Sequence, residues 1–395
     1  MTLFRYTFIY IALFCLSLGA QAQRKQIGEA RSILKSGKNF DKAEQLMTNL
    51  LKDSANRDNK RIYEIWFESV QKQYEQANER FYMKKEQDTA QFFSLVRRMF
   101  TIAECLDSID ARPDKKGRVE PELRKNLSRD MMTYRSNLFF GGAFHVRKGN
   151  FTTSFDYFEA YIDCARQPLF SDYRLDETDN RLAEAAYWAG YSGYRLGDAV
   201  LALRYQKLAL RDSLKAENTL QYAAEAWHWL KDDSMYIATL DQGFRRYPQS
   251  PYFFPRLMDA YTRNRQLEKA LDAASYGLQC DSLNQLFLLA KSTALLNLER
   301  YQESLTYSQK LIAVNDSSAD AYMNAGTACL NIALTIPASN KKEVRKIYQQ
   351  ARPFLERYRQ LAPDDKQKWG PALYRVYFNL NMGKQFDEID KILNK

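Results

Sequence analysis

Similar side chains recur in this chain at intervals of 34 residues, and this interval restricts the possible fold more than any other feature. Small residues stand at Gly190, Ala224, Ser292 and Gly326, all multiples of 34 apart, and only Met258 interrupts the series. Three further series keep the same interval: Ala202, Tyr236, Ala270, Ser304; Leu203, Ile237, Leu271, Leu305; and Leu210, Phe244, Leu278, Ile312. A fixed period of this length is typical of a solenoid built from helical hairpins.

Each hairpin of such an array carries more apolar surface than it can bury alone, so stacking against its neighbours stabilises it. Small residues at the recurring positions allow two helices to approach closely, and a large residue there would cost about 1–3 kcal/mol through overpacking. Strand-like alternation of polar and apolar residues is scarce along the chain. The sequence therefore predicts an all-α fold.

The hairpins resemble tetratricopeptide repeats (TPRs). That family carries a small residue and then an aromatic in the first helix, glycine before the turn, and alanine early in the second helix. The best copy here has Gly190, Tyr194, Gly197, Ala202 and Ala209, and poorer copies follow as far as Tyr322, Ala325 and Gly326. The resemblance covers residues 123–395 well and 24–110 loosely. It implies a right-handed superhelical solenoid of antiparallel helix pairs, with the first helix of each pair lining the concave face.

The pattern divides the chain into five segments. Residues 1–22 read as a secretory signal peptide, 23–120 as irregular helical hairpins, and 121–182 as a TPR-like hairpin with a connecting loop. Residues 183–334 form the regular array of 34-residue repeats, and 335–395 form the last hairpins and a capping helix. The charged, proline-containing stretch 111–121 and the stretch 167–180 break the helical pattern.

The first residues have the three parts of an export signal. Arg5 precedes the apolar run FIYIALFCLSL, and Ala20-Gln21-Ala22 provides a cleavage site. A membrane anchor is the alternative, but the run is short for a membrane span. We therefore expect an exported protein of the periplasm or cell envelope of a Gram-negative bacterium, without a membrane span in the mature chain.

The charge balance is basic but dispersed. The chain has 58 Lys and Arg against 48 Asp and Glu, a net charge of +10. A basic excess can indicate nucleic acid, an anionic surface or an acidic partner. Because the charges alternate along the helices and the chain carries an export signal, we expect a solvated helical surface and no nucleic-acid partner.

No cofactor, metal or catalytic site is predicted. Cys105, Cys164, Cys280 and Cys329 are far apart in the sequence and form no CxxC pair, so we expect mostly buried thiols and no zinc site. The only histidines, His145 and His228, have no companion motif. Acidic pairs fall at turns, where helix capping explains them, and no phosphate loop, HExxH or GxSxG occurs.

Three tyrosines form the most conspicuous candidate for a binding surface. Tyr187, Tyr191 and Tyr194 have i, i+4, i+7 spacing and so share one helical face. Adding 34 gives Gln221, Glu225 and His228, and adding 34 again gives Pro255, Asp259 and Thr262. Further steps give Leu289, Thr293 and Leu296, and then Met323, Thr327 and Leu330. With the nearby arginines, the predicted partner-binding residues are Tyr187, Tyr191, Tyr194, Arg195, Gln221, Glu225, His228, Arg256, Asp259 and Arg263.

Tyrosine and arginine often anchor protein interfaces, so this stripe is a candidate site for an extended peptide or a partner helix. The alternative is that the tyrosines only fill space between helices, as aromatic stripes usually do. Peptide-binding TPR modules of chaperone adaptors carry a Lys/Asn clamp for a carboxylate. Tyrosine, glutamine and glutamate occupy the aligned positions here, so binding of that kind of tail is not predicted.

One tripeptide recurs more often than composition predicts. Asp followed by Ser or Thr and an aliphatic residue begins at Asp53, Asp88, Asp107, Asp212, Asp233 and Asp281. It resembles the O-glycosylation acceptor of some exported Gram-negative proteins. The alternative is turn and cap chemistry, because Asp and Ser favour those places.

These observations favour a non-enzymatic scaffold of the cell envelope that binds a peptide or partner protein in the TPR groove. The alternative function is an exported accessory protein that handles glycan or polymer with the same groove. The identity of the partner and the oligomeric state are open, because groove residues vary freely on a fixed repeat scaffold.

Overall fold

The computed structural model describes residues 23–337 and 339–394, so the predicted signal peptide lies outside the described residues. Within these ranges every regular element is an α- or 3₁₀-helix, as the all-α prediction requires. The described residues up to Leu230 form one compact unit, and those from Lys231 form a second. No helix in the described ranges combines the length and apolar character needed to cross a membrane.

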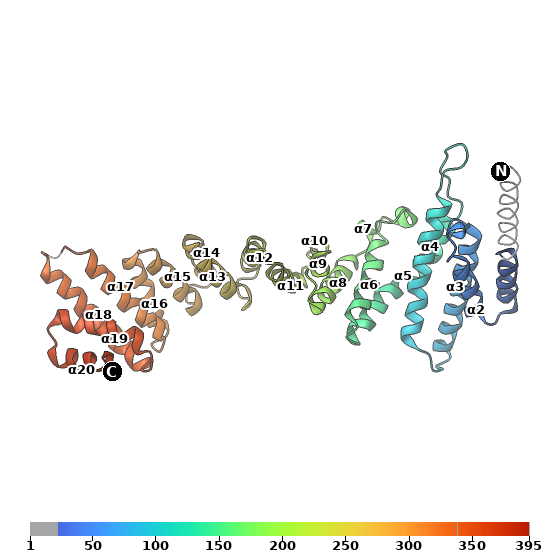
Figure 1. Ribbon diagram of the computed structural model, residues 1–395. Coiled ribbons are helices and arrows are strands. Elements are labelled where there is room, and N and C mark those ends of the chain that lie inside the picture. Colours follow the sequence, from blue (N-terminus) through green and yellow to red (C-terminus); the bar gives the residue numbers. More distant parts are fainter. Residues whose placement is uncertain (1–22, 338, 395) are drawn as a thin grey trace, which may run out of the picture. The chain divides into compact units, whose positions relative to one another are not determined.

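The first unit begins with a helix over residues 23–36 and continues through irregular hairpins to the first regular repeats (Figure 1). Its labelled elements are α2 (Phe40–Leu50), η1 (Ser54–Asn56), α3 (Lys60–Tyr82), α4 (Thr89–Asp110), α5 (Arg124–Arg147), α6 (Phe151–Asp163), η2 (Pro168–Tyr173), α7 (Leu175–Thr178), α8 (Leu182–Leu196), α9 (Ala199–Leu203), α10 (Gln206–Ala209) and α11 (Ala216–Trp229). The longer helices pack against their neighbours along the chain, the short α7 contacts η2, and α8 contacts α6, α9, α10 and α11.

The second unit is a more regular series of helix pairs. Its elements are α12 (Asp233–Arg246), α13 (Phe253–Arg263), α14 (Leu267–Cys280), α15 (Gln285–Asn297), α16 (Tyr301–Val314), α17 (Ala319–Thr335), α18 (Lys341–Leu361), α19 (Lys366–Leu380) and α20 (Gly383–Leu393). Each helix packs against the next, and α15 contacts α17, which contacts α19. This nearest-neighbour pattern is that of a TPR-like solenoid. The division of the chain into five segments and the handedness of a superhelix stay predictions.

Size complementarity between helices recurs with the 34-residue period. A Cβ on Gly243 would lie 2.3 Å from the ring of Phe253, and a Cβ on Gly277 would lie 2.8 Å from the ring of Phe287. One period later the sizes are exchanged, because Leu311 stands in the glycine position and Ala321 in the phenylalanine position. Leu311 and Ala321 are both buried in one apolar cluster. The small residue and the large residue thus exchange helices, while the pair as a whole still combines one of each.

The predicted series of small residues includes Gly190, but the closest approach between α8 and α9 occurs one helical turn later, at Gly193. A Cβ on Gly190 would lie 3.3 Å from the carbonyl oxygen of Ala202, a contact that a small adjustment can relieve. A Cβ on Gly193 would lie 2.3 Å from the backbone nitrogen of Ala202. Gly193 is therefore the position at which only glycine fits between α8 and α9.

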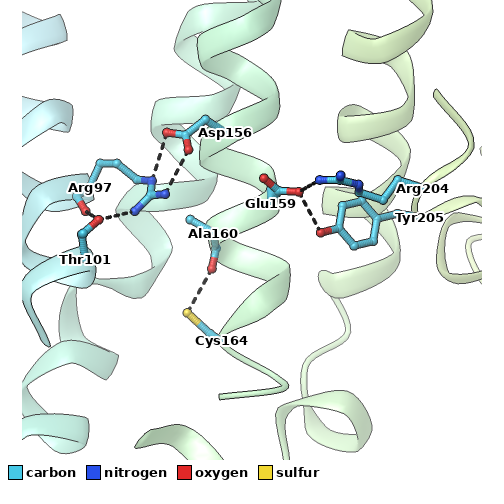
Figure 2. Close-up of polar contacts among 8 residues, drawn as sticks. All are labelled: Arg97, Thr101, Asp156, Glu159, Ala160, Cys164, Arg204 and Tyr205. Atoms are coloured by element: carbon cyan, nitrogen blue, oxygen red, sulfur yellow. Dashed lines mark hydrogen bonds and ion pairs between the residues drawn. The ribbon is translucent and has the colours of Figure 1, made fainter. Parts of the chain in front are cut away.

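Two carboxylates of α6 connect it to the helices on either side (Figure 2). Asp156 accepts two hydrogen bonds from Arg97 of α4, at 3.0 Å from Nε and 2.9 Å from Nη2. Glu159 accepts from Arg204 and, at 3.2 Å, from the hydroxyl of Tyr205. In Figure 2 the two carboxylates point towards opposite neighbours, so α6 is held between its flanking helices by charge as well as by packing.

Two helices depart from the regular pattern of a helix pair. The second helix of the repeat that begins near Ala183 is interrupted, because α9 ends at Leu203 and α10 begins at Gln206. The interruption coincides with the buried Tyr205, whose hydroxyl is held by Glu159 and, at 3.3 Å, by Asp163. Pro353 lies inside α18, which begins at Lys341 and ends at Leu361.

The recurring Asp-Ser/Thr tripeptides have local structural roles. The carboxylates of Asp53, Asp88, Asp212 and Asp281 each accept a hydrogen bond from the backbone N–H two residues later. This is the Asx-turn and N-cap chemistry that favours aspartate at such places. Turn formation therefore explains four of the six copies, and glycosylation of the following hydroxyls stays a prediction.

All four cysteines in the described ranges are free thiols. Cys164 and Cys329 are buried, and burial raises the pKa of each thiol to about 12. Cys105 is half-buried and Cys280 is exposed. The expectation of mostly buried thiols is met by the first two, while Cys280 ends α14 at the surface.

Candidate functional site

Four aromatic side chains from α8 and α11 form a partly exposed cluster in the first unit. The ring of Tyr194 is stacked on Tyr222, with centroids 4.7 Å apart, and on Trp229, at 5.7 Å. The ring centroid of Tyr191 lies 5.8 Å from that of Tyr222. We refer to Tyr191, Tyr194, Tyr222 and Trp229 as the aromatic cluster. Their helices are neighbours in the array, so the cluster forms where two first helices pack together.

Arg195 places a positive charge beside this cluster. Its Nη1 donates a hydrogen bond to the hydroxyl of Tyr191 at 2.6 Å. The guanidinium carbon lies 4.5 Å from the ring centroid of Phe151 and 5.6 Å from that of Tyr191. Stacking and hydrogen bonding therefore both restrict the motion of the exposed guanidinium of Arg195.

Tyr187 contacts the aromatic cluster through Tyr222 but is itself almost fully buried. It is 8 % exposed, and its hydroxyl lies 3.3 Å from that of Tyr222. Burial, the hydrogen bond to Tyr187 and the neighbouring phenols raise the pKa of Tyr222 above its ordinary value. The tyrosine triplet predicted to share one face thus divides into a buried member and two accessible members.

The remaining predicted residues of the first unit lie on α11, the helix that carries Tyr222 and Trp229. Gln221 and Glu225 are partly buried, and His228 is exposed. The sequence did not single out Tyr222 and Trp229. Tyr222 stands 34 residues after Trp188, the neighbour of Tyr187, so the repeat interval applied to Trp188 would have identified it.

The three predicted residues of the second unit, Arg256, Asp259 and Arg263, are exposed on α13. The guanidinium of Arg256 stacks 3.9 Å from the ring centroid of Tyr252 and donates to its carbonyl oxygen at 3.1 Å. Asp259 lines a cleft between α13 and α15.

This cleft has a volume of about 220 Å³ and a mainly apolar lining. We refer to it as the α13/α15 cleft. Five of its lining residues are positions obtained by adding multiples of 34 to the tyrosine triplet: Pro255, Asp259, Thr262, Leu289 and Thr293. Met258 and the exposed Leu286 add further apolar surface. The repeat register therefore leads to one continuous hollow in the second unit.

Of the two histidines, His228 is exposed and His145 is buried. His145 is buried and stacks on Tyr157 with ring centroids 5.4 Å apart, and burial lowers the pKa of its imidazole. Its Nδ1 has no hydrogen-bond partner among the described residues. Within residues 23–337 and 339–394, no group of three or more His, Cys, Asp or Glu side chains is arranged to hold a metal ion.

No protein-family model matches the chain, and the search of curated proteins finds no match either. Solved structures with a similar arrangement include the C-terminal part of a TPR repeat-containing protein from Cytophaga hutchinsonii. It is 12 % identical and covers 64 % of this chain and 93 % of that chain, with a TM-score of 0.41. Yeast Tom70 is 13 % identical, covers 85 % of this chain and 64 % of that chain, and has a TM-score of 0.32. Apo RapI is 12 % identical, covers 94 % and 98 %, and has a TM-score of 0.32. With scores of this size, the TPR-like assignment depends on the helix pairs and their contacts described above.

Proposed function

We propose that the protein is a non-enzymatic interaction scaffold that binds an extended peptide or a partner helix along the faces of its first helices. The observation that carries this proposal is the α13/α15 cleft, lined by residues that the repeat places in one register. An apolar cleft with polar groups at its rim suits an amphipathic segment, whose apolar side chains enter while its backbone and polar groups stay near water.

The aromatic cluster supports the same function in the first unit. Tyrosine, tryptophan and arginine are enriched among residues that dominate binding energy at protein interfaces. Tyr194 and Trp229 are held in stacked geometry and Arg195 is held by Tyr191, so little side-chain freedom is lost on binding.

We also propose that this scaffold is exported to the cell envelope of a Gram-negative bacterium, with residues 1–22 as the export signal. The support is the order of a basic residue, a short apolar run and an A-x-A site. Amino-terminal sequencing of the protein from a periplasmic fraction tests this, because cleavage after Ala22 gives an amino terminus at Gln23. An amino terminus at Met1, or recovery only from the cytoplasm, contradicts it.

A peptide library displayed on phage tests the cleft. Twelve-residue peptides selected on the wild-type protein should lose binding to Leu286→Arg, because Leu286 is exposed and lines the α13/α15 cleft. The matched control is Leu283→Arg, which adds the same charge at an exposed leucine three residues earlier and outside the cleft. Equal binding by both variants would show that the cleft is not the peptide site.

The stacked rings of Tyr194, Tyr222 and Trp229 favour a second candidate function, the binding of glycan by an aromatic platform. A glycan array probed with wild type, Trp229→Ala and the control Tyr82→Ala separates the two functions, since Tyr82 is an exposed ring at the end of α3. Glycan signals lost only in Trp229→Ala support the second candidate. Their absence, together with cleft-dependent peptides, leaves the first.

A further inference from the structure

A second hollow in the second unit is lined by residues other than those of the α13/α15 cleft. It has a volume of about 620 Å³ and is bounded by α12, the end of α13 and α14. Most of its lining residues are polar, and they include Asp233, Asp241, Tyr261, Gln266 and Asp272 together with Arg245 and Lys269. We refer to it as the acceptor pocket, because most of these side chains present oxygen atoms.

An ion-pair network leaves one of these oxygens unused. Arg245 donates from Nε to Oδ2 of Asp241 at 2.9 Å and from Nη2 to Oδ2 of Asp272 at 2.9 Å. The other oxygen of Asp241, Oδ1, is buried and receives no hydrogen bond from any described residue. Oδ1 is therefore shielded from water without a hydrogen-bond donor from the described residues, although the other oxygen of the same carboxylate is paired with Arg245.

Two more polar groups of the same pocket lack partners. Oε1 of Gln266 is buried and accepts no hydrogen bond from residues 23–337 or 339–394. Tyr261 is only 5 % exposed and lines the pocket, and its hydroxyl is bonded to no described side chain or backbone group. Burial and the nearby carboxylates of Asp241 and Asp272 raise the pKa of Tyr261 to about 12, so the hydroxyl stays protonated.

A buried acceptor without a donor costs about 1–3 kcal/mol, so such groups in a folded protein require an explanation. Here the two acceptors and the hydroxyl belong to three residues that line one hollow, Asp241 on α12, Tyr261 on α13 and Gln266 just before α14. Three carboxylates line it against the two cations Arg245 and Lys269, and Arg245 is already engaged by two of the three. A positively charged group with several N–H donors would supply the hydrogen bonds that these oxygen atoms lack.

We propose that the acceptor pocket binds the guanidinium group of an arginine side chain presented by a partner peptide. A guanidinium offers five N–H donors in a fixed plane, so it can reach acceptors on separate helices at once, which the compact ammonium group of lysine does less well. Helices α13 and α14 contribute to both sites, but the two sites have no lining residue in common, so their tests use different variants and can fail separately.

Fluorescence anisotropy with two labelled peptides on the full chain tests this proposal. One peptide contains a single arginine between glycines, and the other contains citrulline, the neutral isostere, in its place. The arginine peptide should bind about tenfold more tightly, as expected when charged hydrogen bonds are replaced by neutral ones. Equal affinities of the two peptides would overturn the proposal.

Two variants assign the binding to this pocket. Tyr261→Phe removes only the unpartnered hydroxyl, and Asp241→Asn removes the charge of the unpartnered oxygen; each should weaken the arginine peptide about fivefold. The matched controls are Tyr301→Phe and Asp316→Asn, which make the same changes outside the pocket and should leave affinity unchanged. Because Tyr261→Phe breaks no ion pair, it keeps the test valid if Asp241→Asn does not fold.

A sugar is the competing occupant, since its hydroxyl groups are also donors. Maltotriose added to the labelled arginine peptide distinguishes the two. Displacement by free arginine methyl ester but not by maltotriose supports the guanidinium site. Displacement by maltotriose at lower concentrations than arginine methyl ester would overturn it in favour of a carbohydrate site.

Discussion

Arg135 and Asp179 form a buried ion pair that joins helix α5 to a connecting segment 44 residues later in the sequence. Nη1 of Arg135 lies 2.6 Å from Oδ2 of Asp179. Arg135 also donates to the carbonyl oxygen of Tyr161 at 3.0 Å, and its guanidinium carbon lies 3.8 Å from the ring centroid of that tyrosine. The Tyr161 hydroxyl completes the group by donating to Asp179 at 2.8 Å.

Removal of the carboxylate should be strongly destabilising. In Asp179→Ala the guanidinium of Arg135 stays buried without its counter-charge, a situation that typically costs about 3–5 kcal/mol. Urea denaturation followed by circular dichroism measures the loss. Asp172→Ala, at an exposed position in the same segment, is the control and should change stability by less than about 0.5 kcal/mol. Equal losses in both variants would contradict this account.

His145 should make the stability of the protein depend on pH. Burial lowers the pKa of the folded imidazole below the ordinary value of 6.5. The unfolded chain then binds a proton at a pH where the folded chain does not, so the stabilising contribution is complete above pH 6.5 and is lost as pH falls from 6.5 towards the folded pKa.

The matched variant is His145→Gln, which cannot titrate in this range. Urea midpoints measured between pH 5 and pH 8 should fall more steeply with decreasing pH in the wild type than in His145→Gln. Identical slopes would show that this histidine does not contribute.

Gly193→Ala should lower stability, because the new methyl group would meet the backbone of α9 at Ala202 and no side-chain rotation can move it away. We expect a loss of about 1–3 kcal/mol in the free energy of unfolding. Gly28→Ala is the control. It lies in the helix over residues 23–36 with no atom within 4 Å of its added Cβ, so helix propensity should raise stability by about 0.5–1 kcal/mol. A neutral Gly193→Ala would refute the close approach.

The exchanged sizes at two successive interfaces predict a rescue by double substitution. Phe287→Ala alone should cost about 3–5 kcal/mol through the cavity left behind. Gly277→Leu alone should cost about 1–3 kcal/mol through overpacking. The double variant, which copies the pair Leu311 and Ala321, should cost less than the sum by about 1–3 kcal/mol.

The control cycle for this rescue combines Gly277→Leu with Phe354→Ala in α18, which takes no part in the contact. Its effects should add within about 0.5 kcal/mol. Additivity in both cycles would mean that Gly277 and Phe287 do not compensate for each other.

The repeat interval predicted the helix pairs and one face of the second unit. Positions such as Asp259 and Thr293 line the α13/α15 cleft because equivalent positions in stacked hairpins face the same way. The interruption at Tyr205 was not predictable in the same way. It coincides with hydrogen bonds to Glu159 and Asp163 on α6, and contacts between distant residues leave no periodic signal.

The repeat interval does not predict the structure of segments that depart from it. The sequence indicates that residues 167–180 depart from the repeat, but it does not show that Leu169, Phe170 and Leu175 within them are buried or that Asp179 is anchored by Arg135. The acceptor pocket was also beyond sequence reasoning. Its unusual feature is that Asp241 and Gln266 have oxygen atoms without donors among the described residues, and this is set by the positions of individual atoms.

The glycine and phenylalanine pairs also bear on how the array assembles. At Gly277 and Phe287 the large side chain comes from the later helix, whereas at Leu311 and Ala321 it comes from the earlier one. A hairpin docked one place out of order would bring two bulky groups together or leave a void between two small ones. The volumes at these contacts therefore discriminate against misregistered stacking, so that similar repeats settle in a single sequence of neighbours.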